Sequence, residues 1–376
     1  MEERVRFILA CRDAEESFVA TCRAFGITRK TGYKWLARYD EHGLEGLQDE
    51  SRVPATHPRW LNDAAVDAII EARKSQPRWG PKKLQTLLLG SRPELARIGI
   101  STIAGVLKRY GLVRPQHRRP RIPRYFEPLG ACVAPNDVWC ADFKGHFALL
   151  DRTRCYPLTV SDAASRFLIK CEGLRVPDEA HVRVHFERAF AEFGLPDRIR
   201  TDNGPPFATR SAGGLSKLAV WWVQLGITPE RIEPGHPEQN GRHERMHRTL
   251  AEEATRPPSR NLRRQQRAFD LFRQQYNQQR PHEALGQKPP ASVYTSSRRP
   301  MPTAVGCPEY GPEYVVRLVD GSGRIRWQMA RVPISPLLVG QPVAARCVAD
   351  GRWEFRYGPV VLGILDERRK EPRLTA

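Results

Sequence analysis

Two motifs in the second half of the chain constrain its fold and its chemistry most. The first, TDNGPPF at 201–207, follows a short apolar run and places Asp202 at the end of an expected strand. The second, PGHPEQNGRHERMHRTL at 234–250, places Glu244 in or near the first turn of an expected helix. A carboxylate at the carboxyl end of a strand, held by a glycine turn, is a common site of catalysis in α/β folds.

Each motif taken alone also has a simpler explanation. Asp202-Asn203-Gly204 has the composition of an Asx-turn, which needs no function. Glu244 has three arginines within four residues of it, so its carboxylate could be a paired surface charge.

The second motif also contains a pattern found in zinc peptidases. The sequence HERMH at 243–247 matches H-E-x-x-H, in which two histidines at i and i+4 of a helix bind zinc. Zinc binding is the weaker interpretation here, because the neighbouring arginines disfavour a dication and no third ligand follows at the spacing of a peptidase.

The two motifs together are more specific than either one. TDNG followed by P-x-Q-x-G-x-x-E resembles the catalytic core of retroviral-type integrases and bacterial insertion-sequence transposases, the DDE superfamily. The second pattern is formed by Pro237, Gln239, Gly241 and Glu244. The resemblance covers roughly residues 125–295.

The same family has a third carboxylate upstream, on the first strand of its core. The segment NDVWCADFKGHF at 136–147 supplies Asp142 near the end of such a strand. The resemblance therefore implies an RNase H-like α/β fold in which Asp142, Asp202 and Glu244 are catalytic and bind metal.

Spacing and motif alignment disagree about the last carboxylate. Asp202 and Glu238 are separated by 35 residues, a spacing familiar in the superfamily, whereas Asp202 and Glu244 are separated by 41. Glu244 is preferred because it follows the Gln-x-Gly element by three residues. Residues 209–215 are interpreted as a small insertion that lengthens the gap.

Clustered carboxylates need a cation, and their hard oxygen atoms suit Mg²⁺ or Mn²⁺. The hypothesis is a phosphoryl transfer with two ions, in which Asp142 bridges the two ions and Asp202 and Glu244 each hold one of them. Water frees a 3′-OH at the end of the element, and that 3′-OH then attacks target DNA. The rival interpretations are a DNA-binding regulator that has lost catalysis and a plain RNase H-like nuclease.

The charge of the chain favours DNA as its partner. The 376 residues contain 61 Lys and Arg against 42 Asp and Glu, a net charge of +19. A membrane-surface role is weakened by the lack of a long apolar stretch, and the acidic start Met1-Glu2-Glu3 does not resemble a signal peptide. Eight cysteines without a CxxC pattern indicate small core residues in a reducing cytoplasm. A bacterial, nucleoid-associated location is expected, and a homo-oligomer is expected by analogy with paired-end reactions.

Residues 1–50 are predicted to form a helix-turn-helix domain. Helices are expected over 3–12, 14–24 and 28–39, and Thr28 is the expected N-cap of the last. That helix presents a basic face to the major groove of DNA, formed by Arg29, Lys30, Lys34 and Arg38. An ordinary three-helix bundle with a solvated basic face is the alternative.

Residues 61–113 are predicted to form a second helix-turn-helix. Asn62 and Ser101 are the expected caps of its first and last helices, and Lys108 and Arg109 are candidate DNA contacts. The basic linker 114–128 follows. Its arginines include Arg118, Arg119 and Arg121, which either track phosphates or belong to a solvated tether.

The catalytic core is assigned to 129–295 and a small C-terminal β-barrel to 310–370. The core is expected to run strand, strand, strand, helix, strand, helix, strand, helix. In the C-terminal part, Asp320-Gly321 and Asp350-Gly351 each predict the turn of a hairpin. The barrel is interpreted as binding DNA or partner subunits, or as serving stability alone.

Overall fold

A computed structural model describes residues 2–13, 16–49, 61–95, 98–113, 129, 131–209, 211–233, 236–369 and 373–375, apart from the side chains of Pro237 and Glu238. The chain divides into two compact units, Met1–Val66 and Asp67–Ala376. Each unit is described by itself below. None of the helices in these residues has both the length and the apolar composition needed to cross a bilayer.

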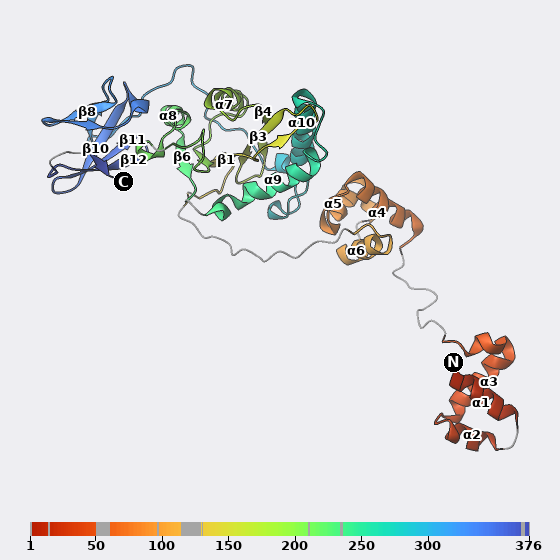
Figure 1. Cartoon of the computed structure of the whole chain (residues 1–376). Coiled ribbons are helices and arrows are strands. Elements are labelled where there is room, and N and C mark those ends of the chain that lie inside the picture. Colours follow the sequence, from red (N-terminus) through yellow and green to blue (C-terminus); the bar gives the residue numbers. More distant parts are fainter. Residues whose placement is uncertain are drawn as a thin grey trace. The chain divides into compact units, whose positions relative to one another are not determined.

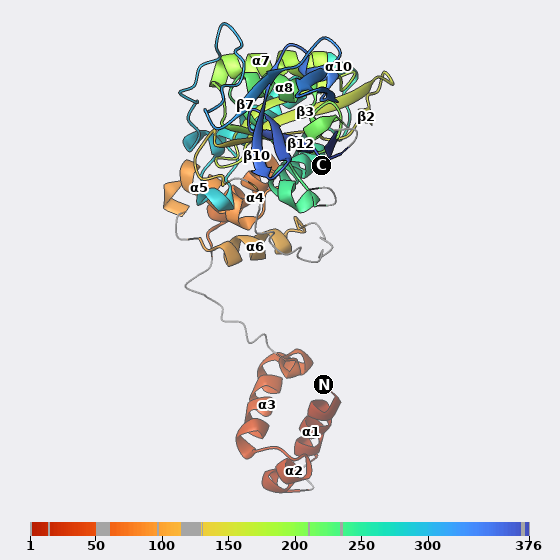
Figure 2. The same ribbon diagram turned by 90° about the vertical axis from the view of Figure 1, so that its left-hand side faces the viewer.

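The first unit contains the three predicted helices, α1 (Glu2–Arg12), α2 (Phe18–Ala24) and α3 (Arg29–His42) (Figure 2). Thr28 caps α3 as predicted, because its hydroxyl accepts a hydrogen bond from Thr31 N at 3.2 Å. Trp35, Leu36 and Tyr39 of α3 pack on a small core. That core consists of Phe7, Ile8, Cys22 and Leu47.

Three further helices follow, α4 (Asp63–Ser75), α5 (Pro81–Ser91) and α6 (Ile100–Arg109). Asn62 caps α4 as predicted, since its Oδ1 accepts from Ala65 N at 2.9 Å. The prediction of Ser101 as the cap of α6 is wrong. The extended backbone of Gly99 begins this helix without a side-chain hydrogen bond, so Ser101 lies inside its first turn.

The centre of the second unit is a mixed sheet with the strand order β4-β3-β1-β5-β6. Its strands are β1 (Val138–Phe143), β3 (Arg154–Asp162), β4 (Leu168–Leu174), β5 (Arg198–Thr201) and β6 (Thr228–Arg231), and the short β2 (Phe147–Ala148) adds to β3. Strand β3 is antiparallel to both β1 and β4, whereas β5 runs parallel to β1 and β6 parallel to β5. Apart from the short β2, the order of strands and helices along the chain is the one predicted for an RNase H-like core.

Helices cover both faces of this sheet (Figure 1). On one face, α7 (Glu179–Phe193) and α8 (Lys217–Gln224) pack on Trp139 and Leu158. On the other face, α9 (Gly241–Ala254) and α10 (Leu262–Gln278) pack on Cys155 and Cys171. Because side chains alternate along a strand, Asp142 and its cross-strand partner Thr159 both face the α9 side.

The C-terminal strands form two open sheets. One has the order β13-β12-β11-β10-β7 and the other pairs β8 with β9. Their bounds are β7 (Val315–Leu318), β8 (Arg324–Trp327), β9 (Ala330–Pro333), β10 (Pro342–Ala349), β11 (Arg352–Tyr357), β12 (Val360–Asp366) and β13 (Leu374–Thr375). The predicted closure into a small barrel is therefore not confirmed.

The first C-terminal hairpin was predicted wrongly and the second correctly. Across Asp350-Gly351, β10 and β11 pair as expected, with Ala349 opposite Arg352. Across Asp320-Gly321, β7 and β8 do not pair with each other. The Asp320 carboxylate accepts from the backbone N of both Ser322 and Arg324, at 2.8 and 3.1 Å, so the turn is longer than the two residues a tight hairpin needs.

Candidate active site

Asp142 and Asp202 occupy equivalent positions along two neighbouring parallel strands, β1 and β5. The register of β1 and β5 pairs Cys140 with Arg200, and each aspartate lies two residues beyond this pair. Asp202 Oδ1 also accepts a hydrogen bond from Gly204 N at 3.2 Å, which is the Asx-turn considered from the sequence. The turn and the placement of a carboxylate beside Asp142 are thus compatible.

The electrostatics of Asp142 indicate that three carboxylates lie near one another. Burial is the main cause that raises the pKa of Asp142 from 3.8 to about 7. The negative charge of Asp202 raises this pKa further and that of Glu244 adds a smaller effect, while the backbone N–H of Phe143 and the charge of Lys144 lower it. The sequence separates these three acids widely, and the fold brings their charges within interaction range.

Glu244 lies in the first turn of α9 and its side chain points to solvent. Among the residues that the structure describes, its carboxylate makes no hydrogen bond and no ion pair. Among the described residues, Glu244 is therefore not part of a surface ion pair, which was the simpler explanation considered above. The side chain of the rival Glu238 lies outside the described part of the chain.

The two histidines beside Glu244 point the opposite way, into the protein. His243 and His247 are 1% and 6% exposed, and their rings pack edge to face at 4.6 Å between centroids. Burial lowers the pKa of His243 to about 3 and that of His247 to about 2, so both are neutral at pH 7. Each lies within hydrogen-bond distance of Thr159.

Two sets of side chains could hold a cation. Asp142, His243 and His247 bring ligand atoms within 4.8 Å of one another. In this set, however, both nitrogens of His243 and one of His247 already lie at hydrogen-bond distance from hydroxyls. The carboxylates of Asp142, Asp202 and Glu244 are the other set. The charges of Asp202 and Glu244 raise the pKa of Asp142, and the hard oxygen donors of the three carboxylates fit Mg²⁺ or Mn²⁺. The residues present thus fit the metal that the sequence predicts.

The predicted DNA-binding side chains occupy two described helices. On α3, Arg29, Lys30 and Lys34 are exposed and Arg38 is half-buried. At the end of α6, Lys108 and Arg109 are exposed. Their contact with DNA stays a prediction. The linker residues Arg118, Arg119 and Arg121 lie outside the described residues.

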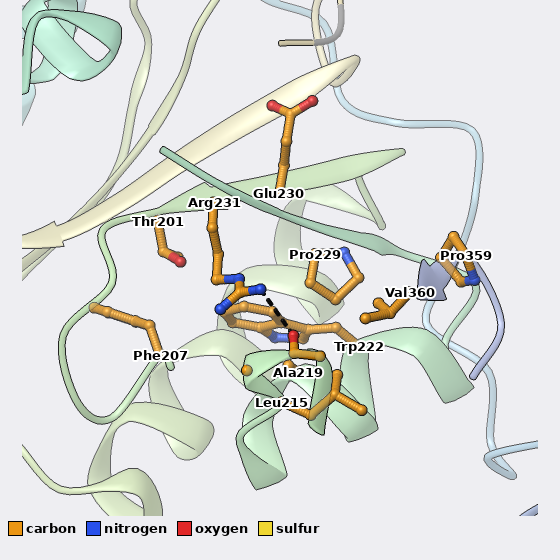
Figure 3. Close-up of a pocket in the computed structure, with 12 residues that line it drawn as sticks. Thr201, Phe207, Leu215, Ala219, Trp222, Pro229, Glu230, Arg231, Pro359 and Val360 are labelled. Atoms are coloured by element: carbon orange, nitrogen blue, oxygen red, sulfur yellow. Dashed lines mark hydrogen bonds between the residues drawn. The ribbon is translucent and has the colours of Figure 1, made fainter. Parts of the chain in front are cut away.

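A cavity of about 250 Å³ lies between the core and the C-terminal sheet (Figure 3). Arg231 extends into it and donates a hydrogen bond to Gly213 O at 2.8 Å. Thr201, Trp222 and Val360 also line it, but none of the three predicted carboxylates does. The candidate active site is therefore separate from this cavity.

Comparison with known proteins places this geometry in a family. The family model of the integrase core domain matches residues 133–237 and a second one 225–290. Models of a helix-turn-helix domain and a homeodomain-like domain match residues 3–55 and 31–107. An uncharacterized protein of insertion element IS476 from Xanthomonas euvesicatoria is 29% identical over 68% of this chain and 71% of its own length. These matches support an insertion-sequence transposase with a retroviral-type integrase core.

Two further proteins are similar to parts of the chain. An uncharacterized protein of insertion element IS407 from Burkholderia multivorans is 27% identical over 64% of this chain and 84% of its own length. The HTLV-2 integrase catalytic core domain in complex with magnesium is 17% identical, with a TM-score of 0.34, and covers 43% of this chain and 99% of its own.

Sequence reasoning missed one group of side chains beside the candidate active site. It set aside the histidines of HERMH as a chance match and gave no role to Thr159. The signal was present in part, because His243 and His247 at i and i+4 share one helix face. Their partner could not be identified, since Thr159 lies 84 residues from His243 in the chain.

Proposed function

We propose that this transposase cleaves DNA at the 3′ ends of its element and joins those ends to target DNA. The observation that carries the proposal is the interaction of three carboxylates, from the end of β1, the turn after β5 and the first turn of α9. In this proposal Asp142, Asp202 and Glu244 are the catalytic residues. A catalytically silent DNA-binding regulator is the second candidate.

In this proposal the carboxylates of Asp142, Asp202 and Glu244 would hold Mg²⁺ or Mn²⁺, two ions in all. Such ions activate a nucleophilic oxygen and stabilise the leaving oxygen in phosphoryl transfer. The chain's own residues bind and orient the DNA. In this proposal Arg245 and Arg248, which are exposed on α9 near Glu244, bind phosphates of the DNA.

The remaining parts of the chain bind the DNA and select its sequence. The helix-turn-helix domains over 1–50 and 61–113 bind the element's ends, and the basic linker 114–128 follows phosphates. The C-terminal part, 310–370, binds DNA or a second subunit. Because two ends are joined together, the working form is a homo-oligomer on the bacterial nucleoid in the cytoplasm.

A strand-joining assay with labelled element-end DNA and Mg²⁺ tests the proposal. Asp142→Asn, Asp202→Asn and Glu244→Gln are each expected to abolish joining and to leave DNA binding unchanged. Glu238→Gln is the matched control, because it removes the neighbouring carboxylate that the spacing favoured. If Glu238→Gln abolishes joining and Glu244→Gln does not, the assignment of the third carboxylate is wrong.

The wild-type protein discriminates between the candidate functions. Sequence-specific binding without joining or cleavage, in Mg²⁺ or Mn²⁺, would favour the DNA-binding regulator. Cleavage that never proceeds to joining would favour a plain RNase H-like nuclease.

A further inference from the structure

Two buried histidines of α9 face the central sheet and have no part in the proposed chemistry. His243 precedes Glu244 and His247 follows it by three residues, so the two rings lie on the inner face of α9 while Glu244 points outward. Buried polar groups of this kind are retained only when their hydrogen bonds are satisfied. The partners of these histidines therefore define what the pair does.

Both histidines meet at one hydroxyl group on β3. Thr159 Oγ1 lies 2.7 Å from His243 Nε2 and 2.7 Å from His247 Nε2. It also lies 3.1 Å from the backbone oxygen of Asp142. A carbonyl oxygen only accepts, so the single proton of Thr159 is donated to Asp142 O. The two Nε2–H groups then donate to the two lone pairs of Thr159 Oγ1.

This assignment fixes the other nitrogen of each ring as an acceptor. His243 Nδ1 accepts from Ser161 Oγ at 2.9 Å, which completes the hydrogen bonding of His243. His247 Nδ1 faces Asp142 Oδ2 at 3.9 Å. All polar atoms of His243 and Thr159 are thus accounted for without a metal ion. The H-E-x-x-H pattern forms a hydrogen-bonded attachment in place of a zinc site.

The attachment joins the two elements that carry the first and the third carboxylate. Thr159 lies directly opposite Asp142 in the antiparallel pair of β1 and β3. Glu244 is held by α9 alone, because its side chain has no partner among the described residues. The N-cap of α9, Asn240, also makes no side-chain capping hydrogen bond. The contact of α9 with Thr159 is therefore a directional polar contact between the element that carries Glu244 and the cross-strand partner of Asp142.

We propose that Thr159, His243 and His247 are positioning residues that hold Glu244 at the distance from Asp142 that metal binding requires. The inference rests on the proposed function, since it takes Asp142 and Glu244 to bind the same metal centre. It adds to that function a role for the Thr159 hydroxyl, which accepts hydrogen bonds from the imidazoles of His243 and His247. Partners behind metal ligands typically contribute about ten- to a hundredfold to metal affinity.

The test compares Thr159→Val with Thr159→Ser. Valine keeps the shape of threonine without its hydroxyl, whereas serine keeps the hydroxyl. The measured quantity is the Mg²⁺ concentration that half-fills the site, obtained by fitting the rise in melting temperature against Mg²⁺ concentration. Thr159→Val is expected to raise this concentration about tenfold or more, and Thr159→Ser to stay within a factor of about two of wild type. The Mg²⁺ concentration for half-maximal joining should shift in parallel.

A second pair of variants covers the case in which Thr159→Val does not fold. His247→Gln retains an N–H donor at similar reach and His247→Leu removes it, so only His247→Leu should weaken Mg²⁺ binding. Thr249→Val is the matched control on the same helix, because the Thr249 hydroxyl bonds only to Arg245 O within α9. Its Mg²⁺ dependence should equal that of wild type.

The outcomes separate this inference from the proposed function. If Thr159→Val and His247→Leu lower the melting temperature but leave the Mg²⁺ dependence unchanged, the contact is merely structural and the inference is overturned. If wild type binds Mg²⁺ but joins no DNA, the proposed function fails, while the Mg²⁺ titrations of the variants still decide the role of Thr159.

Discussion

Asp142 titrates differently in the folded and in the unfolded protein. Its folded pKa is about 7 against an ordinary value of 3.8, first because it is buried and then because Asp202 is close. The folded state therefore binds this proton more tightly than the unfolded state does. The resulting stabilisation is present below about pH 4 and is lost as the pH rises to about 7.

Asp142→Asn removes this titration and should stabilise the metal-free protein at pH 8. The rise in pKa corresponds to roughly 4 kcal/mol between the two protonation states. In EDTA, the melting temperature of the variant should exceed that of wild type by several degrees at pH 8 and by much less at pH 5. Thermal unfolding at the two pH values measures the difference.

Addition of Mg²⁺ is the control for this prediction. It should raise the melting temperature of wild type at pH 8 and leave that of Asp142→Asn nearly unchanged. An equal difference between the two proteins at pH 5 and pH 8 would contradict a raised pKa of Asp142.

The predictability of the site depended on how local each signal was. Asp142, Asp202 and Glu244 could be proposed from the sequence because each stands in a short motif with its own strand, turn or helix signal. Thr159 was not found, because its significance arises from contacts with residues 84 and 88 positions away. No local pattern on β3 marks a hydroxyl that serves two histidines of another element.

At the scale of elements, the same distinction separates correct from incorrect predictions. Helix α3 was predicted because Thr28 and the spacing of its apolar residues are local signals. The hairpin across Asp320-Gly321 failed because β7 pairs with β10, which is distant in sequence. An Asp-Gly pair can begin a tight hairpin or a longer turn, and only the partner strand decides which forms.

The close packing of α3 on α1 and α2 predicts opposite effects of two glycine substitutions. A Cβ at Gly32 would lie 2.8 Å from Cys22 Sγ and 2.9 Å from Phe7 Cζ, whereas one at Gly105 in α6 meets no atom within 4 Å. Gly32→Ala should therefore destabilise the first unit by about 1–3 kcal/mol. Gly105→Ala should stabilise α6 by about 0.5–1 kcal/mol, because alanine has less backbone freedom than glycine in the unfolded chain and loses less of it on folding.

Chemical denaturation followed by circular dichroism measures both effects. Gly32→Ala should also weaken binding to element-end DNA, because α3 carries the predicted recognition face. A Gly32→Ala protein as stable as wild type would contradict the close packing of α3 on α1 and α2.

At the scale of the whole molecule, charge and sequence recognition are carried by different parts of the chain. Residues 1–60 contain ten Lys and Arg and ten Asp and Glu, so the net charge of +19 lies entirely in residues 61–376. Binding to DNA of any sequence depends on the number of phosphates that cations neutralise. The first unit should therefore select the DNA without adding much to this general affinity.

Removal of residues 1–60 should consequently separate the two properties. The shortened protein is expected to bind random DNA with the affinity and salt dependence of the full chain, because its net charge is unchanged. Its preference for element ends over random DNA should fall by about tenfold or more. Binding titrations of both DNAs over a range of salt concentrations measure the two quantities.

If the slope of log affinity against log salt falls markedly, the first unit contacts phosphates through its basic face despite its zero net charge. An unchanged preference for element ends would instead assign recognition to residues 61–113.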